Sequence, residues 1–290
     1  MKLLVNFSRI VRPLSAIKNL ALLLAAFYLS GETLNFPLFF LGFIWLSFIT
    51  SSCYVFNSSN DLEIDENNIN KRHYGQAVRY FGREKSFFIA LILAVAGLIG
   101  GFFINAYFFV SLIVILAINF LYSSKITRFK ERIVLDVLAG GFLSFSIRFV
   151  ASWFVFKISA PPFLFLLALI FAKSGGYLLY KEFDREFLNS INVKNSITVL
   201  AKNASMPISM FFFVLAVLFF ALTCFNGNLF YAPILGFLPR KFLWFLILII
   251  PPLTISYLSA YNIIKADLLT LRRAGFVFWI IAVIIIWLFL

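Results

Sequence analysis

The feature that most constrains this chain is a series of apolar stretches, each about as long as a bilayer is thick. An α-helix needs about 20 apolar residues to cross the hydrocarbon of a membrane. Of the 290 residues, 62% are hydrophobic and only 13% are charged. A soluble domain is usually about half apolar and about a quarter charged. Nine stretches qualify: 14–30, 36–56, 86–104, 106–122, 133–156, 161–181, 207–225, 242–262 and 273–290. We therefore predict an all-α membrane protein, a bundle of nine transmembrane helices.

The segments between these stretches are short and contain no Ser/Gly-rich linker or low-complexity run. We therefore expect residues 1–290 to form a single integral membrane domain. Asn105 separates the third stretch from the fourth, and Pro161-Pro162 marks the start of the sixth.

The distribution of basic residues predicts how the bundle is oriented. The net charge of +13 is spread between the spans and not gathered in one patch, so we expect no nucleic-acid partner. Lys and Arg concentrate in the N-terminal segment and in the loops after spans 2, 4, 6 and 8. Because cytoplasmic loops carry the excess of Lys and Arg, the N-terminus and these loops should be cytoplasmic and the C-terminus outside.

Acidic residues gather just after the second span, in "NSSNDLEID". Asn57, Asp61 and Asp65 are spaced i, i+4, i+8, so they share one face if the helix continues. Oxygen-bearing side chains stacked in this way repel each other unless a cation or a basic side chain lies among them. Hard oxygen ligands suit Mg²⁺, which keeps several waters and is often shared with substrate phosphates.

A second acidic cluster, Glu182, Asp184 and Glu186, follows the sixth span on the same predicted face. Basic residues accompany both clusters: Lys71, Arg72, Arg128 and Lys194. This combination predicts a cytoplasm-facing cavity that holds a magnesium-bridged diphosphate whose organic part lies in the membrane. The alternative is ordinary juxtamembrane charge paired across loops, but two clusters on one face favour a site.

Arg148 lies about fifteen residues into the fifth span, and Lys173 lies within the sixth. Charges inside a membrane are costly and usually face a polar cavity, so we predict that Arg148 anchors a phosphate. Asp136, which opens the fifth span, is expected to favour a helix N-terminus. Tyr54 and Asn119 are predicted to face the cavity.

The two acidic segments resemble the Asp-rich motifs of the UbiA-type intramembrane prenyltransferase superfamily. The first motif, N-D-x-x-D-x-x-x-D, is represented by Asn57, Ser58, Asp61 and Asp65, with Ser58 in place of an acid. The second, Y-x-x-x-D-R-x-D-D followed by K-S, is represented by Tyr180, Asp184, Arg185, Lys194 and Ser196. Phe187 and Leu188 stand where the second motif has further acids, and Glu182 or Glu186 is a candidate substitute.

Other segments resemble one branch, the decaprenyl-phosphate phosphoribosyltransferases. They are "RPLSAIKN", which contains Arg12 and Lys18, "LYSSKI" at residues 121–126, and "LDVLAGGFLSFSIR", which ends at Arg148.

The resemblance implies Mg²⁺-dependent transfer of a polyprenyl group from its diphosphate to a small acceptor within the bilayer. Asp61, Asp65 and Asp184 would be catalytic, and Asn57 and Glu182 would join them as metal ligands. The implied substrate-binding residues are Lys71, Arg72, Arg128, Lys194, Arg148, Lys18, Arg12 and Tyr180. The branch implies an alternative, phosphoribosyl transfer from phosphoribosyl diphosphate to a polyprenyl phosphate. In both reactions a magnesium-bound diphosphate departs from carbon.

Two further classes of function are alternatives to an enzyme. A transporter or channel would carry acids deep within its spans or inverted repeats, and this sequence has neither. An inactive relative that serves as a membrane scaffold is compatible with Ser58, Phe187 and Leu188; retained metal binding would argue against it.

Overall fold

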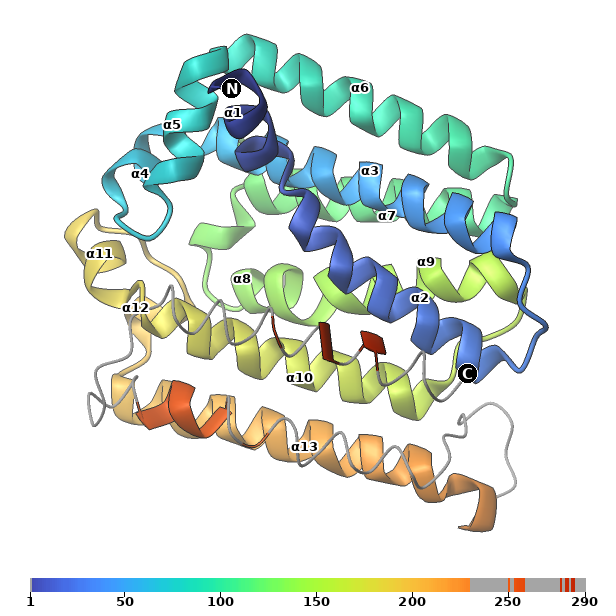
Figure 1. The fold of residues 1–290 in the computed structure, drawn as a ribbon. Coiled ribbons are helices and arrows are strands. Elements are labelled where there is room, and N and C mark those ends of the chain that lie inside the picture. The colour runs from blue at the N-terminus through green and yellow to red at the C-terminus, as the bar shows by residue number, and fades with distance from the viewer. Residues whose placement is uncertain are drawn as a thin grey trace. The chain divides into compact units, whose positions relative to one another are not determined.

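The computed structural model describes residues 2–229 together with residues 250, 253–258, 277, 280–281 and 283–284. Every element in this part of the chain is a helix (Figure 1). The all-α prediction is therefore confirmed for the described residues.

Seven helical segments of the described chain are long and apolar enough to cross a membrane. They are Lys2–Ser30, Phe36–Asn60, Arg83–Phe102, Ala106–Ser123, Leu135–Phe156, Phe163–Glu182 and Ala204–Phe225. Each matches one of the first seven predicted spans, and together they make this an integral membrane protein. The predicted spans 242–262 and 273–290 lie largely outside the described residues.

The chain divides into two compact units, and each is described by itself. Unit 1 comprises residues 1–129 and 147–158, and unit 2 comprises residues 130–146 and 159–290. The prediction of one domain over residues 1–290 stays a prediction.

Unit 1 contains seven α-helices and a 3-10 turn, and it also takes in most of α9 (Ser144–Phe156). They are α1 (Lys2–Val11), η1 (Pro13–Ala16), α2 (Ile17–Ser30), α3 (Phe36–Asn60), α4 (Leu62–Asn67), α5 (Arg72–Phe81), α6 (Arg83–Phe102) and α7 (Ala106–Ser123). The short η2 (Phe129–Glu131) follows. Helix α3 contacts α2, α6 and α7, which makes it the central element of the unit (Figure 1).

Small residues let α6 approach α3 closely. A Cβ atom on Gly100 would lie 2.1 Å from the Trp45 ring, and one on Gly97 would lie 2.8 Å from the Ile49 side chain. Helices in a membrane associate largely through such packing, because lipid tails are as apolar as the side chains they replace. The tight contact fixes α3, and the end of α3 carries the first acidic cluster.

The predicted break at Asn105 is confirmed, since α6 ends at Phe102 and α7 begins at Ala106. The Asn105 side chain accepts a hydrogen bond from the Phe108 backbone N–H at 2.8 Å and so caps α7. Its amide also donates to the Phe154 carbonyl at 2.7 Å, which ties the break to α9.

Unit 2 contains α8 (Leu135–Val137), the π-helical η3 (Leu138–Leu143), α10 (Phe163–Glu182), α11 (Arg185–Ser190), α12 (Ser196–Val199) and α13 (Lys202–Leu229). Helix α10 begins directly after Pro162, as the sequence predicted. It packs along α13 and against η3 (Figure 1).

Two neighbouring glycines of α10 differ sharply in the space around them. A Cβ on Gly175 would lie 2.9 Å from the Ser209 carbonyl oxygen and 3.0 Å from the Phe213 ring. A Cβ on Gly176 would meet only the tip of Phe213, at 3.9 Å. Gly175 is therefore the residue that permits the α10–α13 contact.

We predict that Gly175→Ala lowers the melting temperature of the detergent-purified protein, while Gly176→Ala leaves it unchanged or raises it. Both substitutions gain the same helix propensity, but only the first forces backbone atoms apart, at a cost of about 1–3 kcal/mol. Equal melting temperatures for the two variants would show that Gly175 does not set this packing distance.

Candidate functional site

The first acidic cluster lies where α3 ends. Helix α3 stops at Asn60, Asp61 leaves helical geometry, and α4 begins at Leu62, so the predicted continuous helix is interrupted. The backbone N–H of Asp61 nevertheless bonds the Asn57 carbonyl at 3.0 Å, and that of Asp65 bonds the Asp61 carbonyl at 2.7 Å. The i, i+4, i+8 spacing therefore survives the interruption in its backbone hydrogen bonds.

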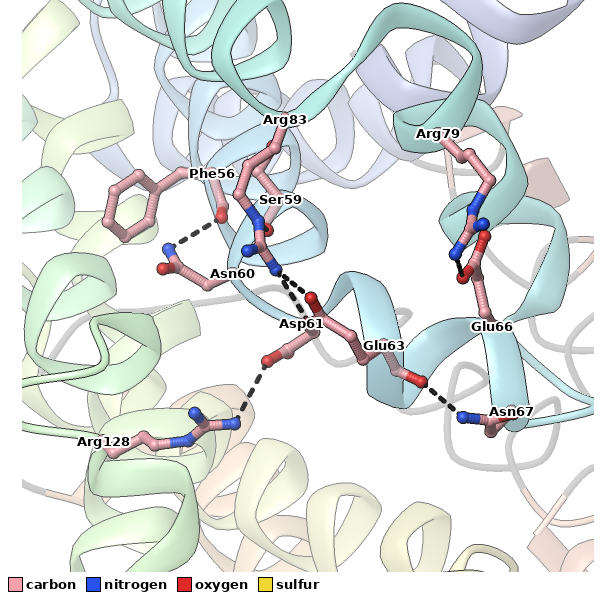
Figure 2. Close-up of polar contacts among 10 residues, drawn as sticks. All are labelled: Phe56, Ser59, Asn60, Asp61, Glu63, Glu66, Asn67, Arg79, Arg83 and Arg128. Carbon is pink, nitrogen blue, oxygen red and sulfur yellow. Dashed lines mark hydrogen bonds and ion pairs between the residues drawn. The ribbon is translucent and has the colours of Figure 1, made fainter.

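Asp61 and Asp65 are both buried. The Arg128 guanidinium lies 3.8 Å from the Asp61 carboxylate and points toward it (Figure 2). Arg128 adopts a left-handed backbone with φ of 49°, which is uncommon for a residue with a Cβ. The sequence predicted a cation or a basic side chain among the stacked acids, and Arg128 is the basic side chain beside Asp61.

The other carboxylates of this segment pair with different arginines. Glu63 accepts from Arg83 at 2.7 and 2.8 Å, and Glu66 pairs with Arg79 (Figure 2). The Glu63 backbone N–H, which donates to its own carboxylate, and the nearby Arg83 guanidinium hold the pKa of the Glu63 carboxyl below its usual value. Glu63 is exposed, so its pair with Arg83 is a surface contact. The segment thus combines an exposed Glu63 and a half-buried Glu66 with buried aspartates.

The side-chain oxygen of Asn57 accepts a hydrogen bond that the sequence did not reveal. The Ser123 hydroxyl, at the end of α7, donates to Asn57 Oδ1 at 2.7 Å. A carbonyl oxygen has two lone pairs, so Asn57 keeps one for a further ligand. Asn119, one turn earlier on α7, donates to the Cys53 carbonyl at 3.4 Å.

Arg12 reaches α3 from the end of α1. Its Nη2 donates to the Ser58 hydroxyl at 2.6 Å, and its guanidinium lies 3.5 Å from the centre of the Tyr74 ring and 5.1 Å from that of Tyr54. Its backbone is left-handed, with φ of 56°. The structure thus brings Arg12 to the first motif, at Ser58.

Arg148 and Lys18 approach the same helix deeper in the span. Arg148 Nη1 lies 3.4 Å from the Tyr54 hydroxyl, and Lys18 is close enough to act on that hydroxyl electrostatically. Tyr54 therefore faces polar groups, and its place in a cavity stays a prediction. Lys71 is half-buried at the start of α5, and the neighbouring Arg72 is exposed.

In unit 2, Glu182 already has strong partners. Arg185 donates to its two oxygens at 2.6 and 2.8 Å, and the Ser205 hydroxyl donates at 2.8 Å. A bidentate, largely buried pair of this kind is strong, so Glu182 is a weaker candidate ligand than the sequence suggested. Asp184 is buried at the position before α11, and Tyr180 is half-buried on α10.

Asp136 holds the segment that follows α11. The Ser196 hydroxyl donates to Asp136 at 2.5 Å, and the Ser196 backbone N–H lies 3.4 Å from the same carboxylate. The Tyr177 hydroxyl lies 3.5 Å away. Sequence reasoning gave Asp136 only a role at a helix N-terminus and missed this network. Lys194, two residues before Ser196, is exposed.

The donors of unit 1 fit Mg²⁺. Among the described residues, no group of three or more His, Cys, Asp or Glu side chains is arranged to hold a metal. Mg²⁺, however, is commonly bound through one or two carboxylates, with waters and substrate phosphates completing its shell. Two buried carboxylates, Asp61 and Asp65, together with the free lone pair of Asn57, supply such a set.

Comparison with known proteins gives one consistent result. The family model for the UbiA prenyltransferase family matches residues 19–261. A UbiA homologue from Archaeoglobus fulgidus bound to GPP and Mg²⁺ has a TM-score of 0.72 and 18% identity, over 97% of this chain and 98% of that one. A UbiA homologue from Aeropyrum pernix K1 has a TM-score of 0.72 and 14% identity, over 94% and 95% of the two chains.

A solved digeranylgeranylglyceryl phosphate synthase has a TM-score of 0.65 and 18% identity, over 99% of this chain and 97% of that chain. No curated protein matches the sequence. At these identities the solved structures establish the fold, and the family model establishes the kinship. The chain belongs to the UbiA prenyltransferase family.

Proposed function

We propose that this protein transfers a polyprenyl group from a polyprenyl diphosphate to a small acceptor, with Mg²⁺ as cofactor. One observation carries the proposal: Asp61 and Asp65 are buried at the end of the apolar helix α3, with Arg128 beside Asp61. A substrate with a greasy tail and a charged head matches that arrangement. Family membership supports the same chemistry, and a relative was solved with GPP and Mg²⁺.

Each part of the site has a distinct task in this proposal. Asn57, Asp61, Asp65 and Asp184 would hold Mg²⁺, which when bound neutralises the departing diphosphate. Arg128, Lys71, Arg72 and Lys194 would hold phosphate oxygens, because fixed cations stabilise the negative charge that develops as the carbon–oxygen bond breaks. The charge pattern of the loops supports a cytoplasmic N-terminus and a site that opens to the cytoplasm.

Phosphoribosyl transfer to a polyprenyl phosphate is the second candidate. The observation that favours it is the second group of cations deeper along α3, where Arg148 meets Tyr54 and Arg12 meets Ser58. A substrate with one diphosphate and one separate phosphate would use both groups.

We expect Asp61→Asn to reduce Mg²⁺-dependent transfer about a hundredfold, because it removes the negative charge that attracts the metal and keeps the shape of the side chain. The assay follows labelled prenyl diphosphate into lipid-extractable product with the purified protein in detergent. A parallel assay uses labelled phosphoribosyl diphosphate with polyprenyl phosphate and so separates the two candidate reactions.

The matched control is Glu63→Gln, two residues away. Glu63 is an exposed carboxylate that faces Arg83, so its loss should leave the rate within about twofold of wild type. Equal rates for Asp61→Asn and wild type would contradict the proposed metal site.

A second prediction concerns the loop that carries Lys194. Ser196→Ala removes the hydroxyl that donates to the buried Asp136, and we expect a loss of about 1–3 kcal/mol of stability and a raised KM for the diphosphate substrate. Melting temperature and steady-state kinetics measure the two effects.

Ser190→Ala is the control, because that exposed hydroxyl bonds only the nearby Phe187 carbonyl. If Ser196→Ala left both KM and the melting temperature at wild-type values, Asp136 would not position this loop.

A further inference from the structure

Two residues of α3 and the residue directly after its end follow one another along one side of the helix, and an arginine meets each of them. Tyr54, Ser58 and Asp61 are spaced i, i+4, i+7, so Ser58 and Asp61 lie about 6 Å and about 10 Å from Tyr54 along the helix axis. Arg148 lies 3.4 Å from the Tyr54 hydroxyl, Arg12 lies 2.6 Å from the Ser58 hydroxyl, and Arg128 lies 3.8 Å from the Asp61 carboxylate. We call Arg148, Tyr54, Arg12, Ser58 and Lys18 the inner cationic group.

The inner cationic group differs from the Asp61 site in its charge balance. Arg128 faces a carboxylate, whereas Arg12 and Arg148 face hydroxyls. Within the described residues of unit 1, no Asp or Glu lies within 4.0 Å of the charged nitrogens of Arg12, Lys18 or Arg148. Two guanidinium groups and an ammonium group thus surround Tyr54 with no countercharge from the unit, in a span where charge is costly.

The hydrogen-bonding capacity of these arginines is only partly used. The Nε atoms of Arg12 and Arg148 are buried, and neither has a hydrogen-bond partner among the described residues. Buried polar atoms in proteins are nearly always satisfied, so these two donors, carried by arginines that both contact α3, indicate a ligand. The guanidinium fork offers five N–H donors and matches the oxygens of phosphate.

The backbone supports the same conclusion. Arg12 reaches Ser58 only because the chain turns through a left-handed residue between α1 and η1, with φ of 56°. Such a conformation costs a residue with a Cβ roughly 1–2 kcal/mol, and strained residues cluster at functional sites. Stacking on Tyr74 then holds the guanidinium in place.

We propose that the inner cationic group binds a phosphate monoester of the substrate, separate from the diphosphate at Asp61 and Asp65. This inference rests on the proposed function, since it assigns the chemical class of a second substrate group. A phosphate monoester has three terminal oxygens and up to two charges, which suits two guanidinium groups, an ammonium group and two hydroxyls. The monoester belongs either to a lipid phosphate or to the 5-phosphate of a phosphoribosyl donor.

The test measures binding without metal. Full-length protein in detergent is titrated in EDTA with farnesyl monophosphate and, separately, with ribose 5-phosphate, by equilibrium dialysis. We expect one of the two probes to bind, which identifies the source of the phosphate. Arg148→Gln and Arg12→Gln should each weaken that binding at least tenfold, whereas Asp61→Asn should leave it within threefold.

The control is Arg79→Gln, an exposed arginine on α5 that pairs with Glu66 and should not affect monoester binding. Circular dichroism and a melting temperature close to wild type show that the Arg148→Gln protein is folded. Should that variant fail to fold, Tyr54→Phe removes only the hydroxyl and is expected to weaken monoester binding severalfold.

Three results would overturn the inference: no binding of either monoester, binding that ignores the Arg12 and Arg148 substitutions, or binding lost equally in Asp61→Asn. The last result would place the phosphate at the metal site. Failure of the proposed function looks different, since GPP would then show no Mg²⁺-dependent binding while monoester binding persisted.

Discussion

The pairing of Asp61 with Arg128 at the end of an apolar helix is the interaction on which the account of this protein depends. A membrane-spanning bundle tolerates charge only where a partner, a cavity or water offsets the cost of leaving bulk solvent. The apolar residues of helix α3 pack against α2, α6 and α7, and its last turn carries polar side chains. The acids are therefore held at a fixed position by a rigid scaffold, as a binding site requires.

The acidic side chains also differ in how closely an arginine pairs with them. Glu63, Glu66 and Glu182 each have an arginine that satisfies them, so they stabilise loops. Asp61 and Asp65 are buried, and the Arg128 guanidinium lies 3.8 Å from the Asp61 carboxylate, longer than the arginine contacts of Glu63 and Glu182. A long pair leaves room for a metal-bound diphosphate to enter between acid and arginine. The same logic distinguishes Arg128 from Arg12 and Arg148, which face hydroxyls.

Much of the fold could be predicted from the sequence, because hydropathy alone decides which segments enter a bilayer. The stretch 36–56 became Phe36–Asn60, and the break at Asn105 appeared where a capping residue interrupts the apolar run. The i, i+4, i+8 spacing of the acidic segment likewise persists in its backbone hydrogen bonds, although α3 ends at Asn60, because such a pattern needs only local helix geometry.

What the sequence did not reveal are contacts between residues far apart in the chain. Arg12 meets Ser58 across 46 positions, and Ser196 meets Asp136 across 60. No periodicity encodes such pairs, because they depend on how helices pack. Nor does composition separate the buried Asp61 from the exposed Glu63, since only the direction of each side chain decides that. The sequence predicts Glu182 as a metal ligand because it does not reveal that the nearby Arg185 binds both of its carboxylate oxygens.

The most direct test of the central claim is to locate the metal. A crystal structure with Mn²⁺ in place of Mg²⁺ and a bound prenyl diphosphate would reveal the ion through its anomalous scattering. We expect a peak in contact with carboxylate oxygens of Asp61 and Asp65 and with the diphosphate. A diphosphate bound with its metal away from both carboxylates would contradict it.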